Sequence, residues 1–152
     1  MIFFGFSCII KFLLIRKDYV RKENGVINME KKNNVEKVLL LLKNMIYEST
    51  SPMETIRFAK YYKKKGLEVV MVLWGPMGIL LGKKNKVGRM RYEEEMRECL
   101  DMGIDVMACD LAAKITGMEQ KELMGGVELV PSFKVADLML KYQEEGQLII
   151  SL

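Results

Sequence analysis

The three cysteines are the side chains best suited to covalent chemistry, because the chain contains no histidine. Without histidine, Ser-His-Asp and Cys-His nucleophile pairs are excluded, and so are histidine zinc sites and imidazole proton shuttles. An odd number of cysteines favours a reducing, cytoplasmic setting over a disulfide framework. The thiols of Cys8, Cys99 and Cys109 are therefore the candidate nucleophiles.

The surroundings of the three cysteines differ. Cys8 lies in an apolar N-terminal stretch, and Cys99 lies on the apolar face of an expected helix, where cysteine packs as a small hydrophobic residue. Cys109 ends a short apolar run and precedes a helix, whose free backbone N–H groups and dipole stabilise a thiolate. Asp110 opposes this effect, because a neighbouring carboxylate favours the protonated thiol. Position alone leaves two interpretations of Cys109 open, a reactive thiol and a buried strand-end side chain.

The other motifs predict no further chemistry. Gly75, Gly78 and Gly82 follow a strand but precede a basic loop, which fits neither a dinucleotide fingerprint nor a P-loop. The net charge is +4, and residues 1–28 carry five basic and two acidic side chains, so the rest of the chain is nearly neutral. Because phosphate binding needs a dense basic face, we expect no nucleic-acid binding. We also predict no metal site and no organic cofactor.

The elements that position Cys109 follow from the pattern of apolar residues after Val35. Ser51, Pro52 and Glu54 indicate a helix start, with Ser51 as the N-cap of a capping box. Expected strands are 37–43, 67–74, 104–108, 127–130 and 147–152, with a short extended piece at 79–81. Expected helices are 51–65, 92–102, 110–116, 119–124 and a last one that begins at Pro131 and Ser132 and ends at Gly146.

Five strands that alternate with helices predict an α/β domain with a five-stranded, mostly parallel sheet and helices on both faces, as in flavodoxin-like folds. Reactive groups in such sheets lie beyond the carboxyl ends of the strands. The loops 44–51, 75–82 and 109–110 should therefore meet at one edge of the sheet. We expect them to form a pocket around Cys109 from Asn44, Ser49, Ser51, Trp74, Gly75, Met77 and Asp110.

Residues 1–34 form an extension unlike the domain that we expect over 35–152. Residues 1–15 are almost entirely apolar but shorter than the ~20 residues of a membrane span, and they lack the features of a secretory signal. Met29 opens a polar, charged stretch just before the first strand. Two main hypotheses follow: Met29 is the true start, or residues 1–15 associate with a membrane. A packed extension is the third.

Three stretches carry a resemblance to a known family. They are LWGPMGILLGK at 73–83, CLDMGIDVMACDLAAKITGM at 99–118 and ELMGGVELV at 122–130. Together they resemble the DsrE/DsrF sulfur-relay family, which includes TusD-like proteins, over residues 36–152. The resemblance implies a DsrE-like fold and assembly into homo-trimers or hexamers. It also implies that Cys109, which matches the strand-end cysteine of sulfur-relay members, accepts a sulfane sulfur as a persulfide. The basic loop 83–91 matches no motif of the family.

The leading hypothesis is a small cytoplasmic sulfur carrier that takes sulfur from a donor protein onto Cys109 and passes it to an acceptor. Persulfide exchange needs only a thiolate and an accessible sulfur, so the absence of histidine is no obstacle. The alternative is a non-catalytic oligomeric binding or scaffold module of the same fold, in which Cys109 is a packing residue.

Overall fold

The computed structural model describes residues 35–44, 49–85 and 91–152. The predictions for residues 1–34, including the start at Met29 and the membrane-associating segment, lie outside the described residues. So do parts of the predicted loops 44–51 and 83–91. Within the described residues, the elements in chain order are β1 (Lys37–Leu42), α1 (Ser51–Lys64), β2 (Glu68–Leu73), η2 (Gly78–Gly82), α2 (Tyr92–Asp101), β3 (Asp105–Cys109), α3 (Asp110–Thr116), η3 (Gln120–Glu122), β4 (Val127–Val130), α4 (Ser132–Glu144) and β5 (Leu148–Ser151).

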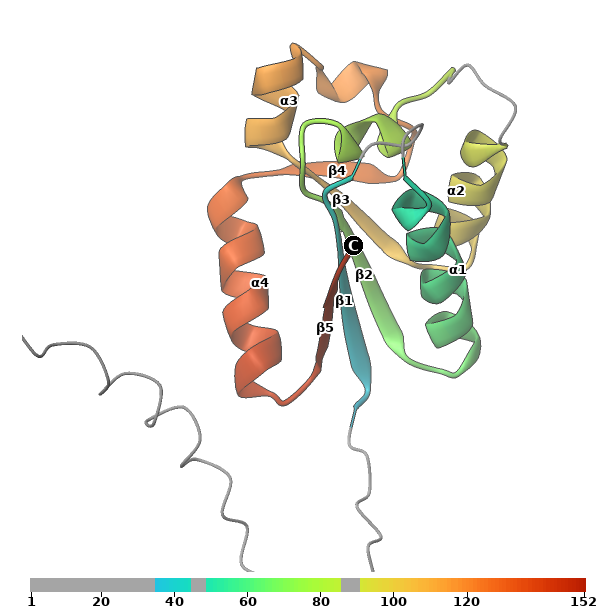
Figure 1. Ribbon diagram of the computed structural model, residues 1–152, viewed down its shortest axis with the longest axis vertical. Helices are drawn as coiled ribbons and strands as arrows, with labels where there is room; N and C mark the ends of the chain where they lie inside the picture. The colour runs from blue at the N-terminus through green and yellow to red at the C-terminus, as the bar shows by residue number, and fades with distance from the viewer. Residues whose placement is uncertain (1–34, 45–48, 86–90) are drawn as a thin grey trace, which may run out of the picture. The chain divides into compact units, whose positions relative to one another are not determined.

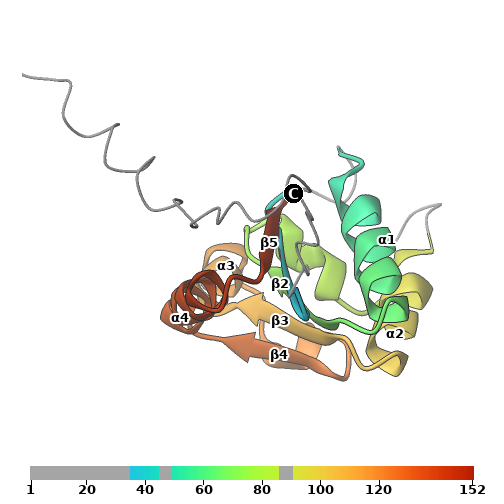
Figure 2. The ribbon, with the colours of Figure 1, turned by 90° about the horizontal axis from the view of Figure 1, so that it is seen from below.

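The five strands form one parallel sheet in the order β4-β3-β2-β1-β5, as the alternating pattern predicts. From β1 to β4 the chain moves in one direction across the sheet, and it then returns past β1 to place β5 at the other edge. Right-handed crossovers in opposite directions put their helices on opposite faces. Accordingly, α1 and α2 cover one face and α4 covers the other (Figures 1 and 2).

The apolar core lies on both sides of the central strands, which explains why β1 reads as an unbroken apolar run. Alternate side chains of β1 enter two clusters. Val38, Leu40 and Leu42 pack with Ile56 of α1 and Met96 of α2. On the other face, Leu39 and Leu41 pack with Val135 and Tyr142 of α4.

Three local predictions are wrong. Residues 79–81 are not extended but lie in the 3-10 helix η2, because Gly78 follows a sharp turn in which the Ile79 N–H donates to the Gly75 carbonyl. Ser51 is not an N-cap: Thr50 holds that position without a side-chain cap, and the Glu54 N–H donates to the Thr50 carbonyl. The predicted helix 119–124 is the shorter η3.

A true capping box lies at η3 instead. The Glu119 side chain accepts from the backbone N–H of Glu122, and the Glu122 side chain accepts from the Glu119 N–H. Among the described residues, no helix is long and apolar enough to cross a membrane.

Candidate functional site

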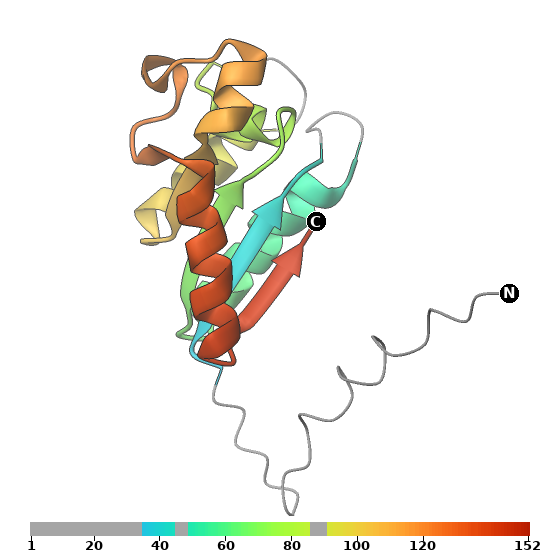
Figure 3. The same ribbon diagram turned by 90° about the vertical axis from the view of Figure 1, so that its left-hand side faces the viewer.

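A hollow of about 380 Å³ lies at the carboxyl edge of the sheet and contains Cys109 in its wall. Figure 3 shows the arrows of β1, β2 and β5 pointing toward the end of the domain where α3 lies. Segments that follow four different strands meet there, as expected for a parallel sheet. The lining residues are Lys43, Trp74, Gly75, Pro76, Cys109, Leu111, Ala112, Ile115 and Ser132.

Cys109 lies where β3 ends and α3 begins. It pairs with Val130 of β4, and its extended backbone (φ −73°, ψ 127°) makes it the N-cap residue of α3. The first N–H groups of α3, which lack intrahelical partners, therefore follow Cys109 directly in the chain. Cys109 is only 2% exposed, and the hollow is the open space that it borders.

Asp110 links the first turn of α3 to the start of α4. The Lys114 Nζ donates to its Oδ2 at 2.8 Å, and the Ser132 backbone N–H donates to its Oδ1 at 3.0 Å. The hydrogen bond from Lys114 is the main reason that the pKa of Asp110 lies below its usual value, and the Ser132 N–H adds to it. Asp110 is thus a charged carboxylate whose charge is compensated by Lys114.

The wall of the hollow is largely apolar. Leu111 and Ile115, one turn apart on α3, are 53% and 65% exposed at the same end of the molecule. Trp74 closes the side of the hollow that β2 provides, and Lys43 is the one basic residue of the lining. The hollow therefore suits a small uncharged or singly negative group more than a multiply charged anion.

Gly75 fits a close approach between two loops of this edge. A Cβ at this position would lie 2.5 Å from the carbonyl oxygen of Lys43, a separation that atoms do not tolerate. Because Gly75 has no side chain, the loop after β2 can lie directly against the end of β1. Gly75 and Lys43 together form this part of the wall of the hollow.

The predicted pocket residues fall into two groups. Trp74 and Gly75 line the hollow with Cys109, Asp110 adjoins it, and Met77 is exposed in the same loop without lining it. Asn44, Ser49 and Ser51 form a separate cluster, with Asn44 Nδ2 and Ser49 Oγ at 3.0 and 2.9 Å from the Ser51 Oγ.

Six lining residues were not predicted from the sequence: Lys43, Pro76, Leu111, Ala112, Ile115 and Ser132. Ser132 could have been found by applying the carboxyl-edge rule to the fourth strand, since only Pro131 separates it from the end of β4. The α3 residues gave no signal, because a seven-residue helix is too short for its exposed and buried faces to be assigned from periodicity.

Cys99 lies in a different environment. It is fully buried between α1 and α2, as its position on the apolar face of α2 predicts. Burial raises the pKa of its thiol to about 11, and the nearby ammonium of Lys60 offsets part of that effect.

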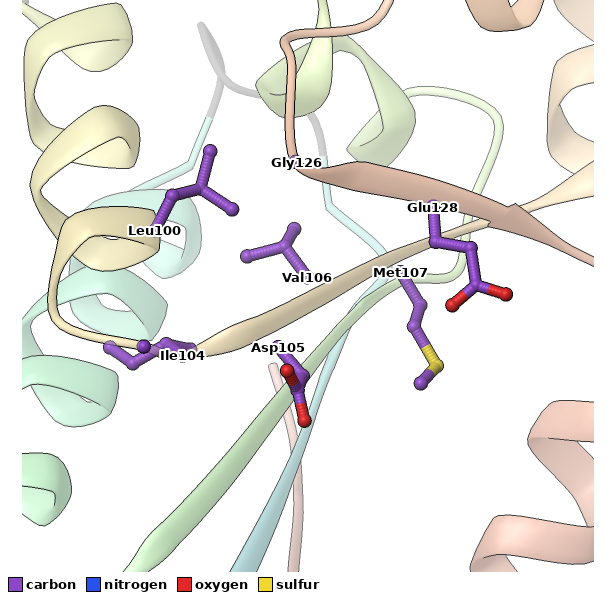
Figure 4. Close-up of a pocket in the computed structure, with 8 residues that line it drawn as sticks. Leu100, Ile104, Asp105, Val106, Met107, Gly126 and Glu128 are labelled. Carbon is purple, nitrogen blue, oxygen red and sulfur yellow. The ribbon is translucent and has the colours of Figure 1, made fainter.

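A second hollow of about 380 Å³ lies at the opposite end of β3, where the strand begins. Figure 4 shows Asp105, Met107 and Glu128 on one side of β3 and β4, and Leu100 and Val106 on the other. No cysteine lines it, and in the part of the chain that the structure describes no group of three or more Cys, Asp or Glu side chains could hold a metal ion.

Comparison with known proteins places the chain in a family. The model of the DsrE/DsrF-like family matches residues 36–150. The chain belongs to this family. The uncharacterized protein MK0008 of Methanopyrus kandleri is a relative, 28% identical over 97 residues, which are 62% of this chain and 79% of that protein.

Solved structures support the DsrE-like fold. The ychN protein of E. coli superposes with a TM-score of 0.66 at 18% identity, over 78% of this chain and all of that one. The protein MTH1491 of Methanobacterium thermoautotrophicum, described as of unknown function, gives a TM-score of 0.62 at 18% identity, over 76% and 98% of the two chains. At these identities the likeness concerns the fold alone. The predicted sheet with helices on both faces is confirmed.

Proposed function

We propose that this protein accepts a sulfane sulfur on Cys109 as a persulfide and passes it to a partner. The observation that carries the proposal is the place of Cys109, which ends β3 and forms part of the wall of the carboxyl-edge hollow. Membership of the DsrE/DsrF-like family supports a sulfur-relay role in general terms. Donor and acceptor proteins and a cytoplasmic location belong to the same proposal.

The chemistry needs no oxidant or cofactor. The Cys109 thiolate attacks the outer sulfur of a donor persulfide, a new S–S bond forms at Cys109, and the donor leaves as its thiolate. In the second step an acceptor thiolate attacks the outer sulfur of the Cys109 persulfide, and the Cys109 thiolate leaves. The hollow provides space for the added sulfur atom beside Cys109.

The described residues provide three supporting contributions. Cys109 is the N-cap residue of α3, the end of a helix where backbone N–H groups lack intrahelical partners. Lys114 compensates Asp110, the carboxylate next to the thiol in sequence. The largely apolar wall offers a surface on which an uncharged outer sulfur can lie beside Cys109.

Intact mass spectrometry after incubation with a persulfide donor tests the proposal. We expect wild type and Cys99→Ala to gain one sulfur, about 32 Da, that dithiothreitol removes, and Cys109→Ala to gain none. Cys99→Ala is the matched control, because it removes the other described cysteine and leaves the hollow intact. Loading of Cys109→Ala to the wild-type level would refute the proposal.

The burial of Cys109 favours a second candidate, a binding module in which this thiol only packs. That candidate predicts a Cys109 that loads no sulfur and reacts with thiol reagents only on unfolding. Failure of sulfur loading together with denaturant-dependent labelling would select it.

A further inference from the structure

The hollow beside Cys109 has the size of a small-molecule site. Its volume of about 380 Å³ lies at the low end of the ~300–1,000 Å³ that such sites occupy. Cys109 belongs to its wall and is only 2% exposed. A group narrow enough to enter the hollow therefore suits this thiol better than the flat surface of a folded protein.

Most of the lining can contact an apolar body. Trp74 and Pro76 contribute from the segment after β2, and Leu111 and Ile115 contribute from α3. The two α3 side chains are 53% and 65% exposed, so they have apolar surface left to bury. An apolar ligand in the hollow would cover part of this surface, which is favourable.

The polar side chains of the hollow differ in what they have left to offer. Asp110, which adjoins the hollow, already accepts from the Lys114 ammonium and the Ser132 N–H. The side chains of Lys43 and Ser132 line the hollow and make no hydrogen bond or ion pair with any residue that the structure describes. One ammonium and one hydroxyl are thus available to a ligand.

The backbone of Lys43 is held firmly in the wall. Its N–H donates to the Leu152 carbonyl at 2.9 Å, and its carbonyl lies against Gly75, where an added Cβ would come within 2.5 Å. The exposed side chain is a flexible four-carbon stem that ends in a point charge. Lys43 therefore offers one movable positive charge from a fixed place in the wall.

This arrangement balances one negative charge. When a sulfur donor is an anion, its attack by a thiolate brings two negative groups together, which costs free energy unless a cation lies beside them. Lys114 is paired with Asp110, so Lys43 is the basic residue of the lining that remains for this task. Apart from the Cys109 thiol itself, the other lining side chains are uncharged at every pH. A second negative charge on the donor would have no partner among them.

We propose that Cys109 also takes sulfur directly from small molecules that carry one negative charge at the transferable sulfur and an apolar body. The inference rests on the proposed function and adds a class of donor to it. Organic hydropersulfides (R–S–S⁻) and organic thiosulfonates (R–SO₂–S⁻) share this chemistry. Lys43 balances the charge of the donor, and Leu111 and Ile115 contact the group R.

The reaction balances without an oxidant or a reductant. The Cys109 thiolate attacks the outer sulfur of the donor, and a new S–S bond forms at Cys109. The bond between the outer sulfur and the rest of the donor breaks, and its electron pair leaves with the donor. A hydropersulfide leaves as a thiolate and a thiosulfonate as a sulfinate, and in both cases Cys109 keeps a persulfide.

Three thiosulfonates test the charge and the body of the donor separately. Benzenethiosulfonate has an apolar ring and one charge, 4-carboxybenzenethiosulfonate adds a second charge to the same ring, and methanethiosulfonate lacks the ring. Loading of the full chain is followed by intact mass spectrometry, with the loading of Cys109→Ala subtracted. Each rate is divided by that of the same donor with free cysteine, so that intrinsic reactivity cancels. We expect benzenethiosulfonate to load Cys109 about 10-fold faster than either of the others.

Substitutions at the charge test the role of Lys43. We expect Lys43→Gln to slow loading by benzenethiosulfonate about five-fold, and Lys43→Arg, which keeps the charge, to load at nearly the wild-type rate. The matched control is Lys141→Gln at an exposed lysine of α4. It removes the same charge nine residues beyond Ser132, about 14 Å along the helix, and should load as wild type.

A substitution at the apolar wall tests the contact with R. Ile115→Ser should slow loading by benzenethiosulfonate about three-fold and leave loading by methanethiosulfonate unchanged, because only the first donor has a ring to contact this side chain. The control is Leu140→Ser on α4, a leucine that is similarly exposed at 62% and does not line the hollow. It should load at the wild-type rate with both donors.

The outcomes separate this inference from the proposed function. Benzyl hydropersulfide is the second arm of the assay, and Lys43-dependent loading by either small donor supports the inference and shows which of the two classes serves. Equal normalised rates for the three thiosulfonates, or equal rates in Lys43→Gln and Lys141→Gln, would overturn it. Loading of Cys109 by a protein-bound persulfide but by neither small donor would overturn this inference and leave the proposed function intact. Loading by none of these donors would overturn both.

Discussion

Two cysteines only ten positions apart in the chain occupy opposite kinds of environment. Both are almost completely buried, at 0% and 2% exposure for Cys99 and Cys109. Cys99 is enclosed by α1 and α2 on the face of the sheet, and Cys109 borders a hollow at its carboxyl edge. Exposed surface therefore does not distinguish a packing cysteine from a candidate nucleophile here. What distinguishes them is the presence of an open space beside the sulfur.

The largest expected difference between the two is the rate of alkylation in the native state. Cys99 lines neither of the two hollows described above, and with a pKa of about 11 it is almost entirely a thiol at pH 8. Its reaction must wait for local opening. We expect iodoacetamide to modify Cys109 roughly 100-fold faster than Cys99, as read by peptide mass spectrometry.

Denaturation supplies the control for this comparison. In guanidinium chloride both cysteines should react at similar rates, because the environment that separates them is lost. Equal rates in the native protein would show that the hollow does not admit reagents and that Cys109 is as enclosed as Cys99.

The environment of Cys99 should also appear in the stability of the protein at alkaline pH. Its pKa is raised in the folded protein, so the fold holds the thiol proton more tightly than the unfolded chain does. This contribution is complete below about pH 9 and is lost as pH rises through 11. Burial raises the pKa of Tyr142 to about 12, which acts in the same direction.

Urea unfolding at pH 8 and pH 11 measures this effect. Between these values we expect wild type to lose about 2 kcal/mol more than Cys99→Ala does, since one pKa unit corresponds to about 1.4 kcal/mol. A Cys99→Ala variant with the same pH slope as wild type would show that Cys99 ionises as easily in the folded state as in the unfolded chain.

A substitution at Gly75 should disturb the surroundings of Cys109 and leave those of Cys99 unchanged. Gly75→Ala places a Cβ against the Lys43 carbonyl, so the wall of the Cys109 hollow must shift. We expect a loss of about 1–3 kcal/mol in the free energy of unfolding and a changed labelling rate at Cys109, with Cys99 labelling as in wild type.

The control for this variant is Gly125→Ala. Gly125 has no atoms within 4 Å of an added Cβ and no positive φ. It should therefore leave stability and both labelling rates near wild type. A silent Gly75→Ala would contradict the close approach of the two loops.

Much of the fold is readable from the sequence, because parallel strands covered on both faces give unbroken apolar runs such as 37–43. Local termini were less predictable. Ser51 has the residue type of an N-cap, yet its hydroxyl oxygen accepts hydrogen bonds from Asn44 and Ser49 in the loop before the helix, and Thr50 holds the N-cap position. The Cys109 position was predicted from a general rule about parallel sheets, but its hollow was not. Side chains as far apart as Lys43 and Ser132 form that hollow, and no periodicity relates them.

The smallest expected effects are on the rate of sulfur loading and come from Asp110 and Lys114, the ion pair next to Cys109. Substitutions of the two residues should change this rate in opposite directions. Asp110→Asn removes the carboxylate, keeps an oxygen to accept from the Ser132 N–H, and leaves the Lys114 ammonium available to a thiolate. Lys114→Gln leaves the Asp110 carboxylate uncompensated. We expect the first variant to load sulfur about two- to five-fold faster than wild type and the second about as much slower, because exposed charges act weakly.

Salt and the double variant complete this test. Both effects should shrink as the ionic strength rises to about 1 M, where charges separated by more than about 3 Å are screened. Asp110→Asn combined with Lys114→Gln should return the rate to near wild type, since the two changes cancel in charge. Variants that both slow loading would show that the pair acts by holding α3 against the start of α4, and that the charge of Asp110 has no part in the reactivity of Cys109.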